Sequence, residues 1–266
     1  MDLQLADSVV CITGASGGIG RALAEEFAAE GCLLVLHAHA RRDDLQRWLA
    51  AQPWRERALA VQADVRDPGQ VDAAFATAVV RFGRVDACVP NAGVWLPPPL
   101  PLHEVPLARV RDTLDINLLG ALWTARAFLA ALARSGPRGD GRGASLTFLG
   151  STAGRFGEAG HADYAASKAG LRGLMLSLKN EIVALDPFGR VNLVQPGWTV
   201  TDRTRPTLQQ PGVIAKVTAT MPLRQLARAR DVARAIVMLS SPAASRHISG
   251  EVLTVAGGME GRVLHD

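Results

Sequence analysis

Short apolar runs alternate with longer segments of helical periodicity along almost the whole chain, and this alternation limits the possible folds more than any other feature. Seven runs rich in Val, Leu and Ile predict strands at residues 8–13, 32–39, 57–63, 85–91, 144–151, 189–195 and 251–255. The segments between them predict helices at residues 18–30, 43–51, 69–82, 106–135, 161–185 and 229–239. Strands joined in this way form a parallel sheet with right-handed crossovers. We therefore predict one doubly wound α/β domain, with a mostly parallel seven-stranded sheet and helices on both faces.

The composition agrees with a single domain over residues 1–266. Apolar residues make up 48% of the chain, enough for a large core, and no internal repeat or long linker divides it. The net charge is +4, but the arginines are scattered, which favours a solvated surface over nucleic-acid binding. Cys11, Cys32 and Cys88 each lie in an apolar run and are expected to be buried free thiols. No cluster of Cys and His predicts a metal site.

The N-terminus and the apolar runs indicate where the protein is located. The first seven residues do not resemble a secretory signal, and no run of ~18 uncharged apolar residues predicts a membrane span. We expect a cytoplasmic protein without membrane contact.

Residues 94–106, with five prolines, and residues 198–222 are predicted to form substrate loops, and the second of these contains a candidate lid. Residues 135–143, rich in Gly and Arg, are expected to form a mobile surface loop.

The turn between the first predicted strand and helix reads TGASGGIG. It contains Gly14, Ser16, Gly17, Gly18, Ile19 and Gly20. Glycines let the backbone turn tightly and approach a diphosphate, and the helix N-terminus offers free N–H groups and a positive dipole end. The turn therefore predicts a dinucleotide-phosphate site, with a tight turn that binds nothing as the alternative. No Lys-Ser/Thr pair follows it, which disfavours a nucleoside triphosphate loop.

The residues after the second predicted strand indicate which dinucleotide is bound. An acid at this position would bond the adenosine ribose of NAD(H) and repel a 2′-phosphate. The chain has His39, Arg41 and Arg42 instead, with no acid before Asp43, and arginine binds phosphate well. We predict a preference for NADP(H), with NAD(H) left open. The alternative is that the two arginines only begin a solvated helix.

The next two strand ends extend the same site. Asp64 and Val65 close the third strand, and the Asp64 carboxylate is expected either to accept from an adenine amino group or to cap the following helix. Asn91, Ala92 and Gly93 end the fourth strand, where small residues would let a cofactor lie across the sheet.

The single tyrosine of the chain, Tyr164, is followed four residues later by Lys168. On a helix the two side chains share one face. A free phenol has a pKa near ~10, and a neighbouring ammonium group lowers it, which suits a general acid or base for carbonyl–alcohol interconversion. Ser151 ends the fifth strand, where its hydroxyl could bond the substrate oxygen. The alternatives are an ordinary amphipathic helix and a strand-end serine.

Taken in order, TGASGGIG, Pro90-Asn91-Ala92-Gly93, Asn117 in DINLLG, Ser151, YAASK and Pro196-Gly197 resemble the short-chain dehydrogenase/reductase family over essentially the whole chain. The resemblance implies a Rossmann fold and a catalytic tetrad of Asn117, Ser151, Tyr164 and Lys168. It implies that tyrosine exchanges the proton, serine orients the carbonyl, lysine lowers the tyrosine pKa and binds the nicotinamide ribose, and asparagine holds a water. It also implies that the carboxamide is held by Pro196, Gly197, Thr199 and Thr201.

One departure from the family concerns Gly17. Members similar to bacterial 3-oxoacyl-carrier-protein reductases often carry arginine there, which helps to hold the 2′-phosphate. The preference for NADP(H) therefore depends on His39, Arg41 and Arg42 alone.

Three aromatic side chains predict where the substrate binds. Trp95, His161 and Trp198 are expected to surround the reactive centre, in an apolar pocket suited to a ketone or acyl group, unless the tryptophans only pack the loops.

We predict an NADP(H)-dependent oxidoreductase that interconverts a carbonyl and a secondary alcohol of a small molecule, such as a 3-oxoacyl thioester. The alternatives are an NAD(H)-dependent sugar, polyol or steroid alcohol dehydrogenase and a non-catalytic dinucleotide-binding regulatory protein. By the resemblance, the two long central helices predict a homotetramer or homodimer.

Overall fold

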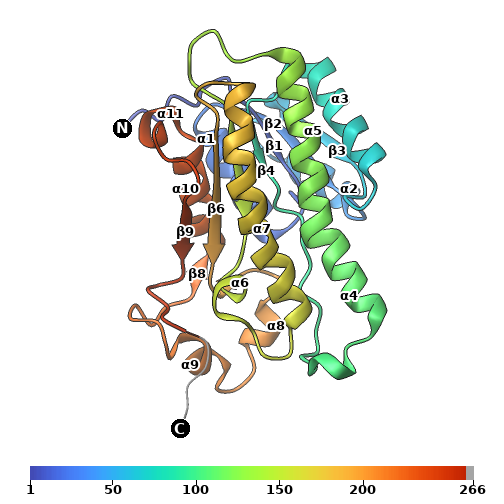
Figure 1. Cartoon of the computed structure of the whole chain (residues 1–266), viewed down its shortest axis with the longest axis vertical. Coiled ribbons are helices and arrows are strands. Elements are labelled where there is room, and N and C mark those ends of the chain that lie inside the picture. The colour runs from blue at the N-terminus through green and yellow to red at the C-terminus, as the bar shows by residue number, and fades with distance from the viewer. Residues whose placement is uncertain (262–266) are drawn as a thin grey trace.

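The computed structural model describes residues 1–261. They form a seven-stranded sheet with its covering helices and a separate two-stranded sheet (Figure 1). The strands of the larger sheet are β1 (Val9–Ile12), β2 (Leu33–Ala38), β3 (Ala58–Gln62), β4 (Ala87–Val89), β5 (Ser145–Leu149), β6 (Arg190–Pro196) and β9 (Val252–Val255). Their order is β3-β2-β1-β4-β5-β6-β9, and every neighbouring pair is parallel. The direction of winding reverses between β1 and β4, and doubly wound sheets bind ligands at such a point. The predicted fold class is confirmed.

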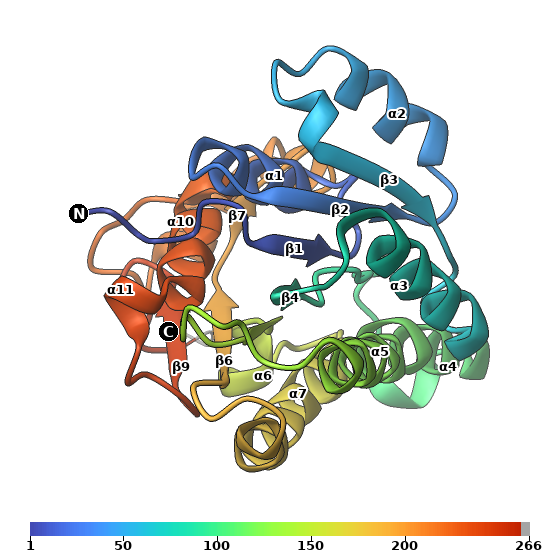
Figure 2. The same cartoon turned by 90° about the horizontal axis from the view of Figure 1, so that it is seen from above.

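Helices cover both faces of the sheet (Figure 2). One face carries α1 (Gly18–Ala29), α2 (Arg42–Ala50) and α10 (Ala229–Ser240), and the other carries α3 (Pro68–Phe82), α5 (Gly120–Ser135) and α7 (Ala162–Glu181). Phe27 and Ile236 are fully buried in the first core, and Phe128 and Leu171 in the second. Because the central strands are buried on both faces, they are apolar throughout instead of alternating.

The predicted helix at residues 106–135 contains a local change of pitch. α4 (Leu107–Leu114) passes through a π-helical turn (Asp115–Leu119) into α5. Such wider turns are rare and often occur at functional sites. Here the turn contains Asn117, which is fully buried. The predicted helix at residues 161–185 is α7 followed by a 3₁₀ turn (Ile182–Ala184).

The apolar stretch Leu107–Ser135 is long and apolar enough to cross a membrane by length and composition alone. Half of its apolar window is buried inside the protein. The stretch packs against α3 and contributes Phe128 and Leu132 to a core of the sheet. It is therefore a core helix of the α/β domain.

Short elements that the sequence pattern did not predict lie in or beside the two predicted substrate loops. They are a 3₁₀ turn (Leu102–Glu104), β7 (Thr199–Val200), α8 (Arg205–Leu208), α9 (Val213–Thr218) and β8 (Ala227–Arg228), with β7 paired to β8. Three more lie elsewhere: a 3₁₀ turn (Arg55–Arg57), α6 (Ala153–Phe156) and α11 (Pro242–Ser245). In Figure 1, α6, α8 and α9 lie beyond the arrowheads of β6 and β9, at the carboxyl edge of the sheet.

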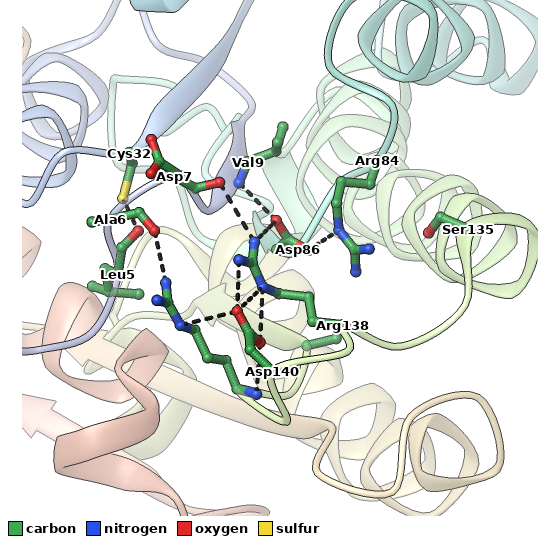
Figure 3. Close-up of polar contacts among 12 residues, drawn as sticks. Leu5, Ala6, Asp7, Val9, Cys32, Arg84, Asp86, Ser135, Arg138 and Asp140 are labelled. Atoms are coloured by element: carbon green, nitrogen blue, oxygen red, sulfur yellow. Dashed lines mark hydrogen bonds and ion pairs between the residues drawn. The ribbon is translucent and has the colours of Figure 1, made fainter.

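The loop at residues 135–143 is tied to the sheet by charge (Figure 3). Arg138 bonds Asp86 at 3.0 Å and Asp140 at 2.8 Å. The Asp86 carboxylate is buried and also accepts from the Val9 N–H at 2.9 Å and from Arg84. The charged residues of this surface loop therefore attach it to Asp86, between β1 and the start of β4, while its predicted mobility stays a prediction.

Candidate active site

A cleft of about 860 Å³ opens at the carboxyl ends of the strands, beside the point where the winding reverses. This volume is within the ~300–1,000 Å³ of small-molecule sites. Its walls are the glycine turn after β1, the ends of the next five strands along the chain and the segment at residues 196–204.

The glycine turn is shaped by close packing. Gly14 has a φ of +66°, and a Cβ there would lie 2.8 Å from the Ala92 Cα. The N-cap residue of α1, Gly17, provides no side-chain cap, and the first turn contains no acid. The first N–H groups of α1 are therefore left for an anion, at the positive end of the helix dipole.

His37, in β2, supports this turn and was not predicted. Its side chain is buried, the Gly14 N–H donates to its Nδ1 at 3.2 Å, and its Nε2 lies 2.8 Å from the Ala63 carbonyl. These contacts fit a neutral ring with the proton on Nε2. Burial lowers the pKa of His37, which favours that neutral form. The only sequence signal for this role is a histidine inside an apolar strand.

The end of β2 places Arg41 over the glycine turn. A Cβ on Gly17 would lie 3.9 Å from the Arg41 Nη2, so this guanidinium occupies the space beside Gly17. His39 and Arg41 line the cleft, whereas Arg42 begins α2 and does not. Within residues 1–261, Arg41 has no acidic partner.

Asp64 is held by neighbouring side chains. Its Oδ2 accepts from Arg66 Nη2 at 2.6 Å and lies 3.7 Å from His39 Nε2. The hydrogen bond from Arg66 is the largest cause of the lowered pKa of Asp64. Asp64 and Val65 both line the cleft. The alternative that Asp64 caps α3 was wrong, because the N-cap is Asp67, which accepts from two backbone N–H groups of α3.

Asn91 ties the end of β4 to the glycine turn. Its Nδ2 donates to the carbonyls of Thr13 at 2.7 Å and Gly14 at 3.1 Å. In return, the Thr13 Oγ1 accepts from the N–H groups of Asn91 and Ala92, each at 3.0 Å. The side chain of Asn91 is thus committed to holding the wall that Ala92 and Gly93 continue.

Tyr164 and Lys168 lie one turn apart on α7 and both line the cleft. The Lys168 Nζ is 6.0 Å from the centre of the Tyr164 ring and donates to the Leu149 carbonyl at 2.9 Å. Lys168 is only 5% exposed. Burial first, and then the charge of Arg203, lower the pKa of Lys168 to about 8. A buried ammonium group beside a phenol favours the phenolate.

Ser151 lies at the end of β5 and lines the same cleft. Its Oγ accepts from the Ala153 N–H at 3.1 Å. This contact fixes the oxygen through its lone pair and leaves the hydroxyl proton to donate to a ligand oxygen.

Asn117 lies behind the wall of the cleft. Its Nδ2 donates to the Val94 carbonyl at 2.9 Å and to the Ser167 Oγ at 3.1 Å, and its Oδ1 accepts from the Val94 N–H at 2.7 Å. A Cβ on Gly93 would lie 3.0 Å from the Asn117 Oδ1 and 3.4 Å from the Lys168 Nζ. Asn117 therefore adjoins Lys168 and fixes the start of the proline-rich loop, without itself lining the cleft.

Two of the three predicted substrate rings line the cleft. Trp95 and Trp198 pack edge to face, with ring centres 6.0 Å apart at 75°. His161 is 2% exposed and stacks against Trp95 at 4.5 Å, but it is not among the lining residues. His161 supports Trp95 from within the protein, and its contact with the substrate stays a prediction.

Arg109, on α4, holds this part of the molecule together. Its Nε bonds Asp163 at 3.1 Å in a nearly fully buried ion pair, and its Nη2 lies 3.0 Å from His161 Nδ1. Its Nη1 donates to the Pro98 carbonyl at 2.6 Å. The proline-rich loop is therefore fixed to the start of α7, next to Tyr164.

Comparison with known proteins places the chain in a family. A family profile described as enoyl-(acyl carrier protein) reductase matches residues 14–260. L-Rhamnose 1-dehydrogenase (NAD(P)(+)) of Azotobacter vinelandii is 35% identical over 97% of this chain and 98% of its own length. The 3-oxoacyl-[acyl-carrier-protein] reductase of Salmonella typhimurium is 32% identical over 94% and 96%. A crystal structure described as a short-chain dehydrogenase/reductase, glucose/ribitol dehydrogenase, from Brucella melitensis has a TM-score of 0.85 at 32% identity, with 96% and 97% covered. The chain belongs to the short-chain dehydrogenase/reductase family.

As a short-chain dehydrogenase/reductase, the protein is an NAD(P)-dependent oxidoreductase of small molecules. Its fold brings most of the predicted cofactor-binding residues to one cleft: Gly14, Ser16, Gly17, Gly18, Ile19, Gly20, His39, Arg41, Asp64, Val65, Asn91, Ala92, Gly93, Tyr164, Lys168, Pro196, Gly197, Thr199 and Thr201. Sequence reasoning missed seven charged or titratable lining residues, which are Arg21, His37, Arg66, Asp112, Glu158, Asp202 and Arg203.

Proposed function

We propose that this short-chain dehydrogenase/reductase interconverts a ketone and a secondary alcohol with NADP(H), and that Tyr164 transfers the proton. One observation supports the proposal most. Ser151, Tyr164 and Lys168 line the same cleft as a glycine-rich helix N-terminus that has no side-chain cap. A bound nicotinamide supplies or accepts the hydride. The residues of the chain bind and orient the reactants and move the proton.

Proton transfer follows from the surroundings of Tyr164. The buried Lys168 ammonium group, kept in place by the Leu149 carbonyl, favours the phenolate form of Tyr164. The phenol proton is then shared more readily with the substrate oxygen in both reaction directions. The Ser151 hydroxyl, with its oxygen fixed by the Ala153 N–H, donates to the same substrate oxygen. Asn117 holds the wall beside Lys168.

The preference for NADP(H) follows from the charges at the adenosine end of the cleft. Arg41 lies beside Gly17 without an acidic partner in the described chain, and the carboxylate of Asp64 is already paired with Arg66. A 2′-phosphate would thus meet an unpaired guanidinium and no free carboxylate.

The substrate class has two candidates. The apolar rings of Trp95 and Trp198, together with Leu96, favour an acyl or ketone substrate such as a 3-oxoacyl thioester. Glu158 and Asp202 also line the cleft, and carboxylates there would accept from the hydroxyl groups of a sugar or polyol. The similarity to a 3-oxoacyl thioester reductase and to a rhamnose dehydrogenase supports keeping both candidates.

A substrate panel tests the proposal. Short ketones, 3-oxoacyl thioesters, sugars and polyols are assayed by nicotinamide absorbance with NADP(H) and with NAD(H). We expect turnover of one carbonyl or secondary-alcohol class and a higher kcat/KM with NADP(H). Equal or better kcat/KM with NAD(H) would contradict the cofactor preference. Binding of the dinucleotides without turnover of any substrate would favour the non-catalytic regulatory alternative.

We also propose that the protein is a cytoplasmic homotetramer or homodimer. Leu119, Leu176 and Val183, on or next to α5 and α7, are large apolar side chains that are 37%, 40% and 49% exposed. A second copy packed on these helices would cover them. Light scattering that detects only a monomer would reject the assembly.

A further inference from the structure

Arg203 crosses the cleft from one wall to the other. Its Nη1 donates to the Gly93 carbonyl at 2.8 Å, so a side chain of the 196–204 segment reaches the residues that follow β4. Two residues earlier, Thr201 packs on the first residue of α1, because a Cβ on Gly18 would lie 3.0 Å from the Thr201 Cβ. The segment that carries Arg203 therefore lies over the N-terminus of α1, where phosphates bind.

The charge of Arg203 is not balanced by an acid. Among the described residues no carboxylate pairs with it, whereas its neighbour Arg205 pairs with Asp202 at 3.5 Å. Two other cations act on it or are acted on by it within the cleft, Lys168 and Arg41. After burial, the charge of Arg203 lowers the pKa of Lys168, and the charge of Arg41 lowers the pKa of Arg203. Cations that face one cleft repel each other unless an anion lies between them.

We propose that Arg203 clamps the diphosphate of the bound dinucleotide, by exchanging its bond to the Gly93 carbonyl for bonds to phosphate oxygens. The N–H groups of α1 would hold the diphosphate from one side, and the Arg203 guanidinium would close over it from the other. This inference rests on dinucleotide use in the proposed function, and it does not depend on the preference for NADP(H).

The position of Arg203 distinguishes the diphosphate from two other anions. A 2′-phosphate belongs beside Arg41 and Gly17, at the end of β2. An anionic group of the substrate belongs near Trp95 and Trp198, beyond the reactive residues. Arg203 contacts the wall at Gly93, between these two ends of the cleft.

Binding titrations of Arg203→Gln test the proposal without any turnover. Dissociation constants are measured by calorimetry for NADPH, NADH and adenosine 2′-phosphate, which lacks the diphosphate. We expect NADPH and NADH to bind about 10- to 100-fold more weakly, by the same factor, since charge-assisted hydrogen bonds of ~1.5–3 kcal/mol are lost. Adenosine 2′-phosphate should bind unchanged. Arg205→Gln is the matched control, and it should leave all three constants unchanged.

Further results separate the clamp from other roles. Arg203→Lys keeps the charge and should recover part of the dinucleotide affinity, whereas Arg203→Gln, which keeps a donor for the Gly93 carbonyl but no charge, should not. If Arg203→Gln loses affinity for NADPH and adenosine 2′-phosphate but keeps its affinity for NADH, the proposal is overturned in favour of a 2′-phosphate contact. Unchanged dinucleotide affinity in Arg203→Gln would also overturn it. If the unchanged protein binds neither dinucleotide, the cofactor use in the proposed function fails instead.

Discussion

Lys168 should lower the free energy of unfolding of the unliganded protein at neutral pH, and its replacement by methionine should raise it. Burial, and then the charge of Arg203, lower the pKa of Lys168 from 10.5 to about 8. This difference corresponds to about 3 kcal/mol by which the folded state disfavours the charged amine. Methionine has a similar shape and no charge, but it loses the bond to the Leu149 carbonyl, worth about 1 kcal/mol. Lys168→Met should therefore be about 2 kcal/mol more stable at pH 7.

The size of this effect falls with rising pH in a defined window. Below pH 8 the Lys168 amine is charged in the folded and unfolded chains, and the full penalty is present. Between about pH 8 and 10.5 the unfolded chain still binds the proton and the folded chain does not, so the free energy of unfolding rises with pH. At pH 9.5 the penalty should have fallen by about 2 kcal/mol, which removes most of the advantage of Lys168→Met.

Urea unfolding followed by tryptophan fluorescence measures the difference between the two proteins. It is done at pH 7 and pH 9.5, without cofactor and at one protein concentration. Lys179→Met, on the same helix but half-buried and outside the cleft, is the control for the loss of a lysine from α7. The reasoning is refuted if Lys168→Met is less stable than the unchanged protein at pH 7, or if their difference is the same at both pH values.

Three further substitutions test the site and its support. Tyr164→Phe should lower kcat by about 10²- to 10⁴-fold in the nicotinamide absorbance assay and leave the Kd of NADPH within about twofold, so retained turnover would remove Tyr164 from its role. Arg41→Gln should weaken NADPH binding by about tenfold and spare NADH, and equal losses for both would contradict the 2′-phosphate contact. Arg109→Met leaves the Asp163 carboxylate buried and unpaired, and urea unfolding should detect a loss of about 3–5 kcal/mol. The same change at exposed Arg126 should cost less than ~1 kcal/mol, and similar losses for the two would refute the argument.

The features that sequence reasoning predicted correctly depend on local chemistry. A buried parallel strand needs an apolar run, and the turn after β1 needs glycine where φ is +66° at Gly14. Tyr164 and Lys168 are neighbours through the helical repeat alone. These requirements act over a few residues, so the residue types and their spacing predict them. The π-helical turn at Asp115–Leu119 escaped prediction because helical periodicity continues on both sides of it.

The residues that the sequence did not reveal have a different kind of partner. His37 binds the N–H of Gly14, Arg203 binds the carbonyl of Gly93, and Asp86 binds the N–H of Val9. Each of these partners is a main-chain group brought near by the sheet from a distant part of the chain. Almost every residue has an N–H and a carbonyl, so no residue type or spacing distinguishes the one that will be bonded. A lone histidine, arginine or aspartate therefore looks the same in the sequence whether it supports a cofactor loop or faces solvent. Only the assembled strand order, which places β2 and β4 on either side of β1, separates the two cases.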